Sequence, residues 1–395
     1  MMLLSKAMKV MLGFIGVLIL LAPLTVLAQN KVVVIPLFGD DAKPLKNIVT
    51  VAKANGMFTD PVAAVNSITD ASEINPYLVV IGPGVYQITS TLVMKPSVHI
   101  IGSGENVTIL SGTISGVSPG VSSAIVSGSN DSSLSSLKVE NAGGGQNSIG
   151  LFNHSTSPRV SNVRFDATGG IYNCGVYNVH YSGPTMTDVT AWASGGTENY
   201  AFYNEGFSSA KMTNVTARVS GGTVSVGIYN SSSAPIMTNV NAEAAAGTYT
   251  IGIHNADGSS PVMVGISVRG SSGGEETYGV YNGNSSNPTM TNVIATASGG
   301  PNNYGVRNEN SYPTMTDVTT RAFGGAFSAG IYNYQSSPSI RRSTIQGDTA
   351  GLYSSGGYVM VSQSTIIGGV DGTGTKKCVA SDNGSGEALN SSCSL

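Results

Sequence analysis

The sequence has few charged residues, and neither sign dominates. Only 10% of its 395 residues are Asp, Glu, Lys or Arg, and 19 basic against 22 acidic side chains give a net charge of −3. No basic stretch supplies the electrostatic attraction that nucleic acids or anionic lipids require. We therefore expect no nucleic-acid partner, and the same balance disfavours a polyanionic ligand of the pectate type.

Signals for metals and cofactors are also scarce. The four histidines, His99, His154, His180 and His254, occupy different positions of the repeat described below, so they make no metal site. The clustered acids that bind calcium are missing as well. The turn at Gly102-Ser103-Gly104 is not followed by the helix pattern of a phosphate-binding loop. We predict neither a metal nor a cofactor.

Only one apolar run is long enough to meet a membrane, and it lies at the N-terminus. Lys6 and Lys9 precede the apolar stretch 10–21, and Val26-Leu27-Ala28 has the small residues of a signal-peptidase site. Residues 1–28 are therefore predicted to be a cleaved signal peptide, and no later segment is long enough to span a bilayer. The expected location is outside the cytoplasm: periplasmic, extracellular or at the cell surface.

The three cysteines fit an exported protein. Cys378 and Cys393 both lie in the polar tail, residues 371–395, where a disulfide between them would close the C-terminal end. Cys174 lies inside a repeat and is predicted to be a buried thiol rather than a reactive one.

Glycine, in contrast, is abundant, with 51 residues, and hydrophobic residues make up 41% of the chain. This apolar content can form a core, which excludes both a collagen-like and a disordered chain. Ser, Thr and Asn are frequent, whereas the helix formers Glu, Lys and Arg are few. Such a composition is typical of short strands separated by turns.

An internal repeat of about 26 residues indicates the fold. The phrase Gly-Val/Ile-Tyr-Asn begins at Gly175, Gly227, Gly279 and Gly330, and a second phrase, Pro-Thr-Met-Thr-Asp-Val-Thr-Ala at Pro184, recurs later in the chain. Each repeat offers two or three short strands and no helical periodicity. The sequence predicts an all-β, right-handed parallel β-helix, a solenoid of about a dozen coils over residues 77–370.

The ends of a solenoid expose strand edges that need protection. Residues 29–76 are predicted to form an N-terminal strand and a helical cap. Asp60 is the expected N-cap and Pro61 the first helical residue, with Val62, Val65 and Ile68 on one face.

Alternation along the strands predicts which columns of residues face the core. The column of Val280 is apolar in every coil and is expected to face inward, together with the column two residues earlier, which contains Cys174 and Tyr278. The asparagine column shares this inward parity and predicts a hydrogen-bonded ladder: Asn153, Asn178, Asn204, Asn230, Asn255, Asn282, Asn308 and Asn333. A second column is expected at a bend: Asn162, Asp188, Asn214, Asn239, Asn292 and Asp317.

Residues 48–112 contain, in order, Ile48-Val-Thr-Val-Ala-Lys, the segment 61–68, Tyr77-Leu-Val-Val-Ile-Gly-Pro-Gly-Val-Tyr and Ile101-Gly-Ser-Gly-Glu-Asn-Val-Thr-Ile-Leu-Ser-Gly. This order resembles the opening of pectin methylesterases and related pectin-lyase-like proteins, which implies a right-handed parallel β-helix. The catalytic motifs of that family are not found: the Gln pair, the acid/base Asp motif and the nucleophilic Asp beside an Arg are missing. The polygalacturonase and pectate lyase signatures are missing too, so the resemblance concerns fold rather than reaction.

Three acids are candidates for catalysis. Glu205, Asp257 and Glu309 each follow a ladder asparagine on every second coil, and an expected separation of about 10 Å is near the upper limit for an inverting glycosidase. Acids beside Gly and Ser are also commonly just solvated. Glu275 and Glu276 form another pair, with no acidic neighbour expected on the adjacent coils.

The second candidate site is a column of aromatic residues on the outward side of the strand. It includes Tyr177, Tyr203, Tyr229, Tyr281 and Tyr332, at an expected spacing of about 5 Å. Such rings pack against each other in any sheet, but an exposed aromatic strip also binds sugar rings.

Three functions are compatible with these features. The leading hypothesis is a secreted, non-catalytic β-helix that binds polysaccharide or acts at the cell surface. The alternatives are a polysaccharide-active enzyme of the pectin-lyase-like class (esterase, lyase or glycoside hydrolase) and a structural or adhesive rod. The sequence carries no signal for the oligomeric state or the identity of a ligand.

Overall fold

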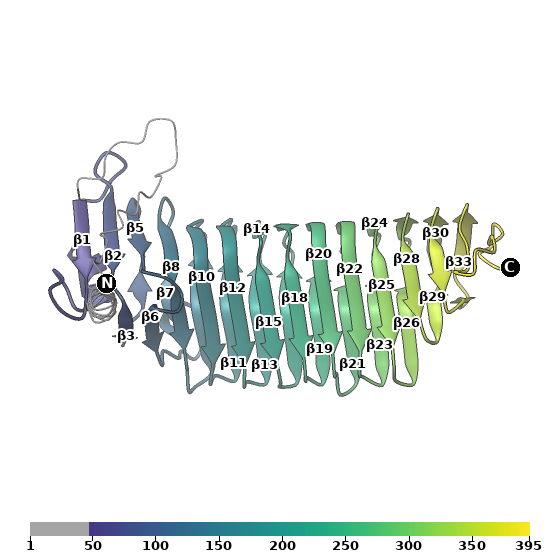
Figure 1. The fold of residues 1–395 in the computed structure, drawn as a ribbon, viewed down its shortest axis with the longest axis horizontal. Coiled ribbons are helices and arrows are strands. Elements are labelled where there is room, and N and C mark those ends of the chain that lie inside the picture. The colour runs from purple at the N-terminus through teal and green to yellow at the C-terminus, as the bar shows by residue number, and fades with distance from the viewer. Residues whose placement is uncertain (1–46) are drawn as a thin grey trace, which may run out of the picture. The chain divides into compact units, whose positions relative to one another are not determined.

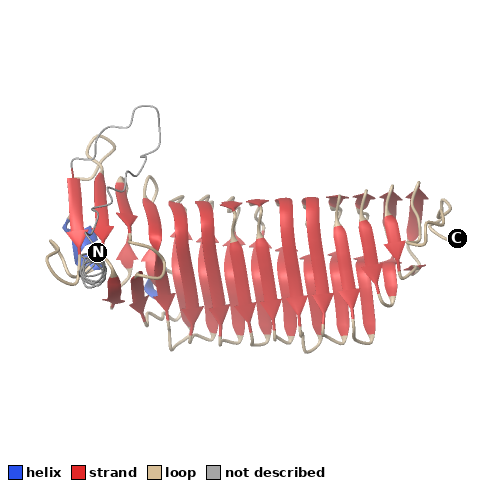
Figure 2. Cartoon of the chain, in the orientation of Figure 1, coloured by secondary structure: helices blue, strands red, loops and turns tan. Residues whose placement is uncertain are grey.

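The computed structural model describes residues 47–395. The predicted signal peptide, 1–28, and the start of the predicted N-terminal segment lie outside the described residues. Within them the chain is an all-β parallel β-solenoid of about 12 turns with winding of the right-handed type, and only 3% of it is helical (Figures 1 and 2). The predicted all-β solenoid is confirmed. None of the helices in residues 47–395 combines the length and the apolar character needed to cross a lipid bilayer.

Two sheets, both with parallel pairing between coils, surround the core. The smaller sheet has 12 strands: β4 (Leu92–Val93), β7 (Ala124–Ser127), β9 (Asn147–His154), β11 (Tyr172–Val179), β13 (Glu198–Glu205), β16 (Val224–Ser231), β19 (Tyr249–Ala256), β21 (Glu276–Asn282), β23 (Asn302–Glu309), β26 (Phe327–Tyr334), β29 (Ala350–Ser355) and β32 (Val370–Asp371).

The larger sheet has 21 strands: β1 (Asn47–Val51), β2 (Tyr77–Ile81), β3 (Gly84–Ile88), β5 (Val98–Ile101), β6 (Thr108–Gly112), β8 (Ser133–Asn141), β10 (Arg159–Thr168), β12 (Thr185–Ser194), β14 (Lys211–Thr213), β15 (Thr216–Ser220), β17 (Ile236–Thr238), β18 (Asn241–Ala245), β20 (Val262–Ser271), β22 (Thr289–Ser298), β24 (Thr314–Thr316), β25 (Thr319–Phe323), β27 (Ser339–Arg341), β28 (Thr344–Gly347), β30 (Tyr358–Ser362), β31 (Thr365–Ile367) and β33 (Thr375–Val379).

The larger sheet bends once in each coil, at the second column that the sequence predicted. Long strands such as β12 run through the bend, whereas the next coil divides there into β14 and β15. Asp188 and Asn214 both have a φ of 54° at this point, in the left-handed region that Asn and Asp tolerate better than most residues. Asn214 Nδ2 also donates to Asp188 Oδ1 at 3.0 Å, so the column links successive bends.

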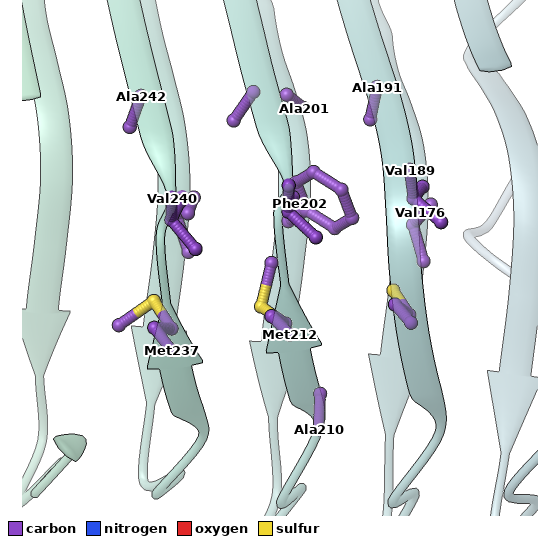
Figure 3. Packing of buried hydrophobic residues seen from close by; sticks show 14 of the residues in the cluster. Val176, Val189, Ala191, Ala201, Phe202, Ala210, Met212, Met237, Val240 and Ala242 are labelled. Carbon is purple, nitrogen blue, oxygen red and sulfur yellow. The ribbon is translucent and has the colours of Figure 1, made fainter. Parts of the chain in front are cut away.

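Equal positions of successive repeats lie on top of one another in the core. Val176 of β11 pairs in register with Phe202 of β13, and Met186 of β12 with Met212 of β14. The inward side chains of the two sheets pack together in one cluster, in which Phe202 and Met212 lie among small residues such as Ala191 and Ala242 (Figure 3). Because each coil repeats this layer, the core extends through the stack.

The smaller sheet breaks the expected alternation at the glycine of its repeat. Ala201 and Phe202 are consecutive, yet both are fully buried in the same inner cluster (Figure 3). At the equivalent Gly279 a Cβ would lie 2.5 Å from the carbonyl oxygen of Gly305 and 3.0 Å from the backbone nitrogen of Thr296 in the opposite sheet, so this position also points inward. The side chain before the glycine must then face outward.

The predicted inward orientation of the Cys174 and Tyr278 column is therefore wrong. These side chains are buried, but in a second cluster on the outer side of the smaller sheet, separate from the cluster that contains Val280. Close approach of the two sheets at the glycine explains the difference, since it requires two consecutive inward residues.

The predicted asparagine ladder is confirmed. Each Nδ2 donates to the Oδ1 of the next coil over 2.7–2.9 Å, from Asn153 to Asn333, and all eight side chains are fully buried. Among the described residues, only the terminal Asn153 Oδ1 and Asn333 Nδ2 of this column lack a partner. The ladder satisfies polar groups that the turn would otherwise bury unpaired.

The predicted helix is present as α2 (Pro61–Ser67). Asp60 Oδ1 accepts from the backbone nitrogen of Val62 at 2.9 Å, and Pro61 is the first helical residue. Ala64 and Val65 are buried in the inner cluster. A short 3-10 helix, η1 (Val121–Ser123), precedes β7. That α2 protects the end of the solenoid stays a prediction.

The C-terminal tail joins the sheet through β33, which pairs with β30. The predicted disulfide between Cys378 and Cys393 is confirmed, and Cys174 is an unbonded, buried thiol. Burial raises the pKa of that thiol well above its usual range.

Peptide mapping of the unreduced protein should recover Cys378 joined to Cys393. Cys174 should react with a thiol reagent only after unfolding, because burial both blocks access and disfavours the thiolate. Mass spectrometry of alkylated native and denatured samples measures both results. A peptide that links Cys174 to either tail cysteine would contradict the outward column described above.

Candidate functional site

The outer side of the smaller sheet carries a continuous aromatic surface, which we call the aromatic face. It is wider than the single column that the sequence predicted, because the column before the glycine also points outward. Its members are Phe152, Tyr172, Tyr177, Tyr200, Tyr203, Tyr229, His254, Tyr278, Tyr281, Tyr304, Arg307, Phe327, Tyr332 and Tyr353.

The predicted spacing of the tyrosine column is confirmed. Ring centroids of Tyr177 and Tyr203 lie 4.9 Å apart, and those of Tyr203 and Tyr229 lie 4.7 Å apart. The rings are less exposed than an open strip would be: only 8% of Tyr177 is accessible, and Tyr203 and Tyr229 are half-buried. Side-by-side packing in the sheet explains both the spacing and the burial.

The orientation of the rings limits what a ligand can reach. The planes of His254 and Tyr281 differ by 13°, and those of Tyr332 and Tyr353 by 6°, so these pairs stack face to face along the solenoid. The edges and hydroxyl groups of such rings, rather than their faces, are then left for a ligand. In the predicted column the planes of Tyr177 and Tyr203 differ by 82° and those of Tyr203 and Tyr229 by 42°. These rings therefore do not form the row of parallel faces on which successive sugars would stack in the simplest form of the sequence hypothesis.

Tyrosine hydroxyls on this face donate to carboxylates. Tyr177 Oη donates to Glu205 at 2.8 Å, and Tyr281 Oη donates to Glu309 at 2.9 Å. Tyr200 and Tyr278 do the same to the glutamates two residues before them, Glu198 and Glu276. Burial, followed by the hydrogen bond to Glu309, raises the pKa of Tyr281 to about 12, so it remains a donor at neutral pH.

Arg307 occupies one position of the tyrosine column. Its guanidinium lies 5.4–5.8 Å from the ring centres of four tyrosines, Tyr278, Tyr281, Tyr304 and Tyr332. Cation–π attraction of this kind is strengthened when water is excluded, and the Arg307 side chain is only 20% exposed. The arginine therefore replaces an aromatic ring without interrupting the column.

Two acids converge on this arginine. Arg307 Nη1 lies 3.4 Å from Glu276 Oε1, and Nη2 lies 3.0 Å from Glu309 Oε2. The expectation that Glu276 has no acidic neighbour is wrong, because both glutamates share one guanidinium. The repeat spacing already places Glu276 and Glu309 on strands of adjacent coils, β21 and β23, so their proximity could have been predicted from the sequence.

The three acids proposed from the sequence share no hydrogen-bond partner. Glu205 accepts from Tyr177, and Glu309 binds Tyr281 and Arg307. Asp257 accepts instead from Ser231 Oγ at 2.9 Å and from Asn284 Nδ2 at 3.2 Å. Each carboxylate is thus held by its own set of donors.

His254 lies between Tyr229 and Tyr281, with ring centroids 4.9 and 4.6 Å away. Burial lowers the pKa of this imidazole to about 4, so it is neutral at neutral pH. The positive charge on the face then comes from Arg307, against acids that include Glu198, Glu205, Glu276 and Glu309. The face has an excess of negative charge.

Within residues 47–395, no three His, Cys, Asp or Glu side chains approach closely enough to share a metal ion.

No protein-family model matches the chain, and no curated protein matches it in sequence. Solved structures do match it. The A-module of the mannuronan C-5 epimerase AlgE4 from Azotobacter vinelandii is 13% identical, with a TM-score of 0.47 over 82% of this chain and 91% of that chain. The pectin methylesterase PemA from Erwinia chrysanthemi is also 13% identical, with a TM-score of 0.39 over 75% and 90%.

A third match is the catalytic domain of a GH87 alpha-1,3-glucanase, which is 10% identical, with a TM-score of 0.47 over 86% of this chain and 66% of that domain. The structural neighbours are therefore parallel β-helix proteins, and they include a pectin methylesterase, the family that residues 48–112 resemble. At identities of 10–13% and TM-scores below 0.5, these likenesses carry no conclusion about the chemistry of any residue.

Proposed function

We propose that this chain is a secreted, non-catalytic protein that binds a polysaccharide on its aromatic face. The observation that carries the proposal is the network of tyrosine hydroxyls and carboxylates on that face, for example Tyr177 with Glu205 and Tyr281 with Glu309. Rings that are already packed and hydrogen-bonded lose little conformational entropy when a ligand binds. Hydroxyl and carboxylate groups at their edges match the many hydroxyl groups of a glycan.

The charge of the face selects the class of glycan. Its acids outnumber Arg307, which itself is bound by Glu276 and Glu309. A polyanion such as pectate would be repelled. We therefore propose a neutral polysaccharide as the ligand.

The non-catalytic part of the proposal rests on how the acids are held. Glu205, Asp257 and Glu309 each accept hydrogen bonds from other side chains of the protein, and a carboxylate already held in this way is not free to act as a general acid or base on a glycoside. Incubation of the protein with neutral polysaccharides should release no reducing sugar.

A glycan array followed by isothermal titration tests binding. Tyr203→Ala with Tyr229→Ala should weaken affinity for a glycan from the array by about tenfold or more, because two neighbouring members of the face are removed. The same change should lower stability by only about 1–2 kcal/mol, through lost packing between the rings. Tyr358→Ala, on β30 of the larger sheet, is the control and should bind as the wild type does. Unaltered affinity in the Tyr203/Tyr229 double variant would remove the face as the binding surface.

A polysaccharide-active enzyme is the second candidate, and one observation favours it. Glu276 and Glu309 come from adjacent coils and both form an ion pair with Arg307. Among the described residues of the aromatic face, they are the only two carboxylates that share a partner. If neutral polysaccharides are cleaved, Glu309→Gln and Glu276→Gln should each abolish turnover. Turnover that survives both changes would place the activity elsewhere.

A further inference from the structure

Two aromatic side chains are largely exposed to solvent in the loops that follow the asparagine ladder. Tyr181 is 71% exposed and Phe207 is 64% exposed, on consecutive coils. Their ring centroids are 5.4 Å apart and their planes differ by 16°, so the rings stack on each other. Large apolar rings at this exposure contribute little to the core, and their presence needs another reason.

The backbone makes these two positions unfavourable for aromatic residues. Tyr181 has a φ of 62° and Phe207 a φ of 65°, in the left-handed region that bulky side chains rarely adopt. Strain of this kind tends to persist where a side chain has a functional role.

Two other coils show that the loop does not require an aromatic residue. The backbone nitrogens of Tyr181 and Phe207 donate to the next coil, to the carbonyl oxygens of Gly206 and Ser232. The same bond to the next coil is made by Gly258 and Ser285, which also have positive φ. Glycine therefore fills this position without strain, and the aromatic rings are an addition to what the fold requires.

The pair is connected to the aromatic face through histidines. Ring centroids of Phe152 and His154 are 6.3 Å apart, and those of His154 and His180 are 4.8 Å apart. His180 directly precedes Tyr181. A glycan on the aromatic face could thus continue around the corner of the coil onto the exposed pair.

The coils on both sides leave the outer ring faces uncovered by large side chains. Ser155 occupies the loop of the preceding coil, and Ser232 and Ser233 occupy that of the following coil. A pyranose ring presents C–H groups on one face, and these favour the negative face of an aromatic ring. The Ser155 and Ser232 hydroxyls donate to the backbone carbonyl oxygens of His180 and Asp257, so they can serve a ligand only as acceptors.

We propose that Tyr181 and Phe207 form a sugar-binding corner, which stacks against a pyranose ring of a neutral polysaccharide at the edge of the aromatic face. The inference rests on the proposed function for the class of ligand. It adds a contact by ring stacking, which the packed rings of the face itself largely lack.

The test uses the double variant Tyr181→Gly/Phe207→Gly of the full chain. The probes are four neutral hexasaccharides, of β-1,4-linked glucose, xylose, mannose and N-acetylglucosamine. We expect affinity for at least one probe to fall by about tenfold or more, since two stacking rings are lost. The melting temperature should stay equal or rise, because glycine relieves the left-handed strain.

Two matched changes serve as controls. Tyr312→Ser removes another exposed tyrosine, 57% accessible, whose own φ is not positive, and it should leave affinity unchanged. Gly258→Tyr introduces an aromatic residue at the equivalent position and should lower the melting temperature.

The outcomes separate this inference from the proposed function. If the glycine double variant binds as the wild type does while Tyr203→Ala/Tyr229→Ala does not, the proposed sugar-binding corner is overturned and binding by the aromatic face is supported. If only the glycine double variant loses affinity, the sugar-binding corner is supported and binding by the aromatic face is contradicted. A clear drop of melting temperature in the glycine double variant would show that the rings serve packing, and would overturn the inference. Absence of binding to all four probes by the wild type would overturn it as well.

Discussion

Replacing Asn230 with alanine is expected to lower the free energy of unfolding by about 2–5 kcal/mol. Asn230 Oδ1 accepts from Asn204 at 2.9 Å, and its Nδ2 donates to Asn255 at 2.8 Å. Alanine removes both bonds and leaves a donor and an acceptor unpaired in a column that water does not reach. Each unsatisfied buried group carries the full cost of its lost hydration.

Asn333 provides a control at the end of the same ladder. It has only one bond within the column, from Asn308 at 2.7 Å, and its own Nδ2 has no partner. Asn333→Ala should therefore cost about half as much as Asn230→Ala. Urea unfolding followed by circular dichroism measures both. Equal losses at the two positions, or none at Asn230, would mean that the ladder does not stabilise the fold.

Acidification is expected to destabilise the protein through His254, by about 3 kcal/mol between pH 6.5 and pH 4. The folded-state pKa is about 4, because packing between neighbouring rings keeps much of the half-buried imidazole from water, whereas an unfolded chain titrates near its usual 6.5. As the pH falls below 6.5, the unfolded state binds a proton that the folded state does not. Stability therefore falls with pH over this window, and above 6.5 this group has no effect.

His254→Tyr tests this directly, since tyrosine occupies the same position in the flanking coils as Tyr229 and Tyr281. Urea unfolding at about pH 7.5 and about pH 4.5 should show a smaller loss of stability in the variant than in the wild type. His154→Tyr, at an exposed position, should lose as much as the wild type. If His254→Tyr also keeps the full loss, the buried imidazole is not its origin.

The period of the sequence was sufficient to predict much of the fold. Because equal positions stack one coil apart, the spacing of Asn230 and Asn255 predicts their contact without any knowledge of the turns. The bend at Asp188 follows in the same way, from residue type at a repeated position, whereas the disulfide followed from the two cysteines of the tail. Ligand binding by Tyr177, Tyr203, Tyr229, Tyr281 and Tyr332 stays a prediction.

The main error came from a rule of strict alternation. It placed Cys174 and Tyr278 on the same side as Val280, although the glycine between them allows two consecutive inward residues. A signal was present: between Gly150 and Gly351 the equivalents of Gly279 are replaced only by Ala201, in the coil of β13, and a small residue suits a crowded inward position better than an open surface. The contacts of Arg307 with both Tyr278 and Tyr281 were missed for the same reason. Strict alternation places these two tyrosines on opposite sides of the sheet, whereas two consecutive inward residues place both on the outer side.

A second buried polar column also escaped sequence reasoning. Asn173 accepts from the backbone nitrogen of Gly170 at 2.9 Å, and Asn199 and Asn303 make the same bond to Gly196 and Gly300. In other coils this position is Ser or Thr, as at Ser225 and Thr277. The mixture of residue types hides the column, because each can bind the turn by a different geometry.

The asparagine ladder also has a direction. Every Nδ2 donates toward the C-terminal end, so the amide dipoles add head to tail, as peptide dipoles do in an α-helix. An unpaired acceptor at Asn153 and an unpaired donor at Asn333 are then the inevitable termini of the series. An inserted coil with an asparagine at this position would add one bond and no new unpaired atom. The number of coils can thus change by whole repeats while the number of unsatisfied amide groups stays the same, which makes length the property that this architecture can vary most easily.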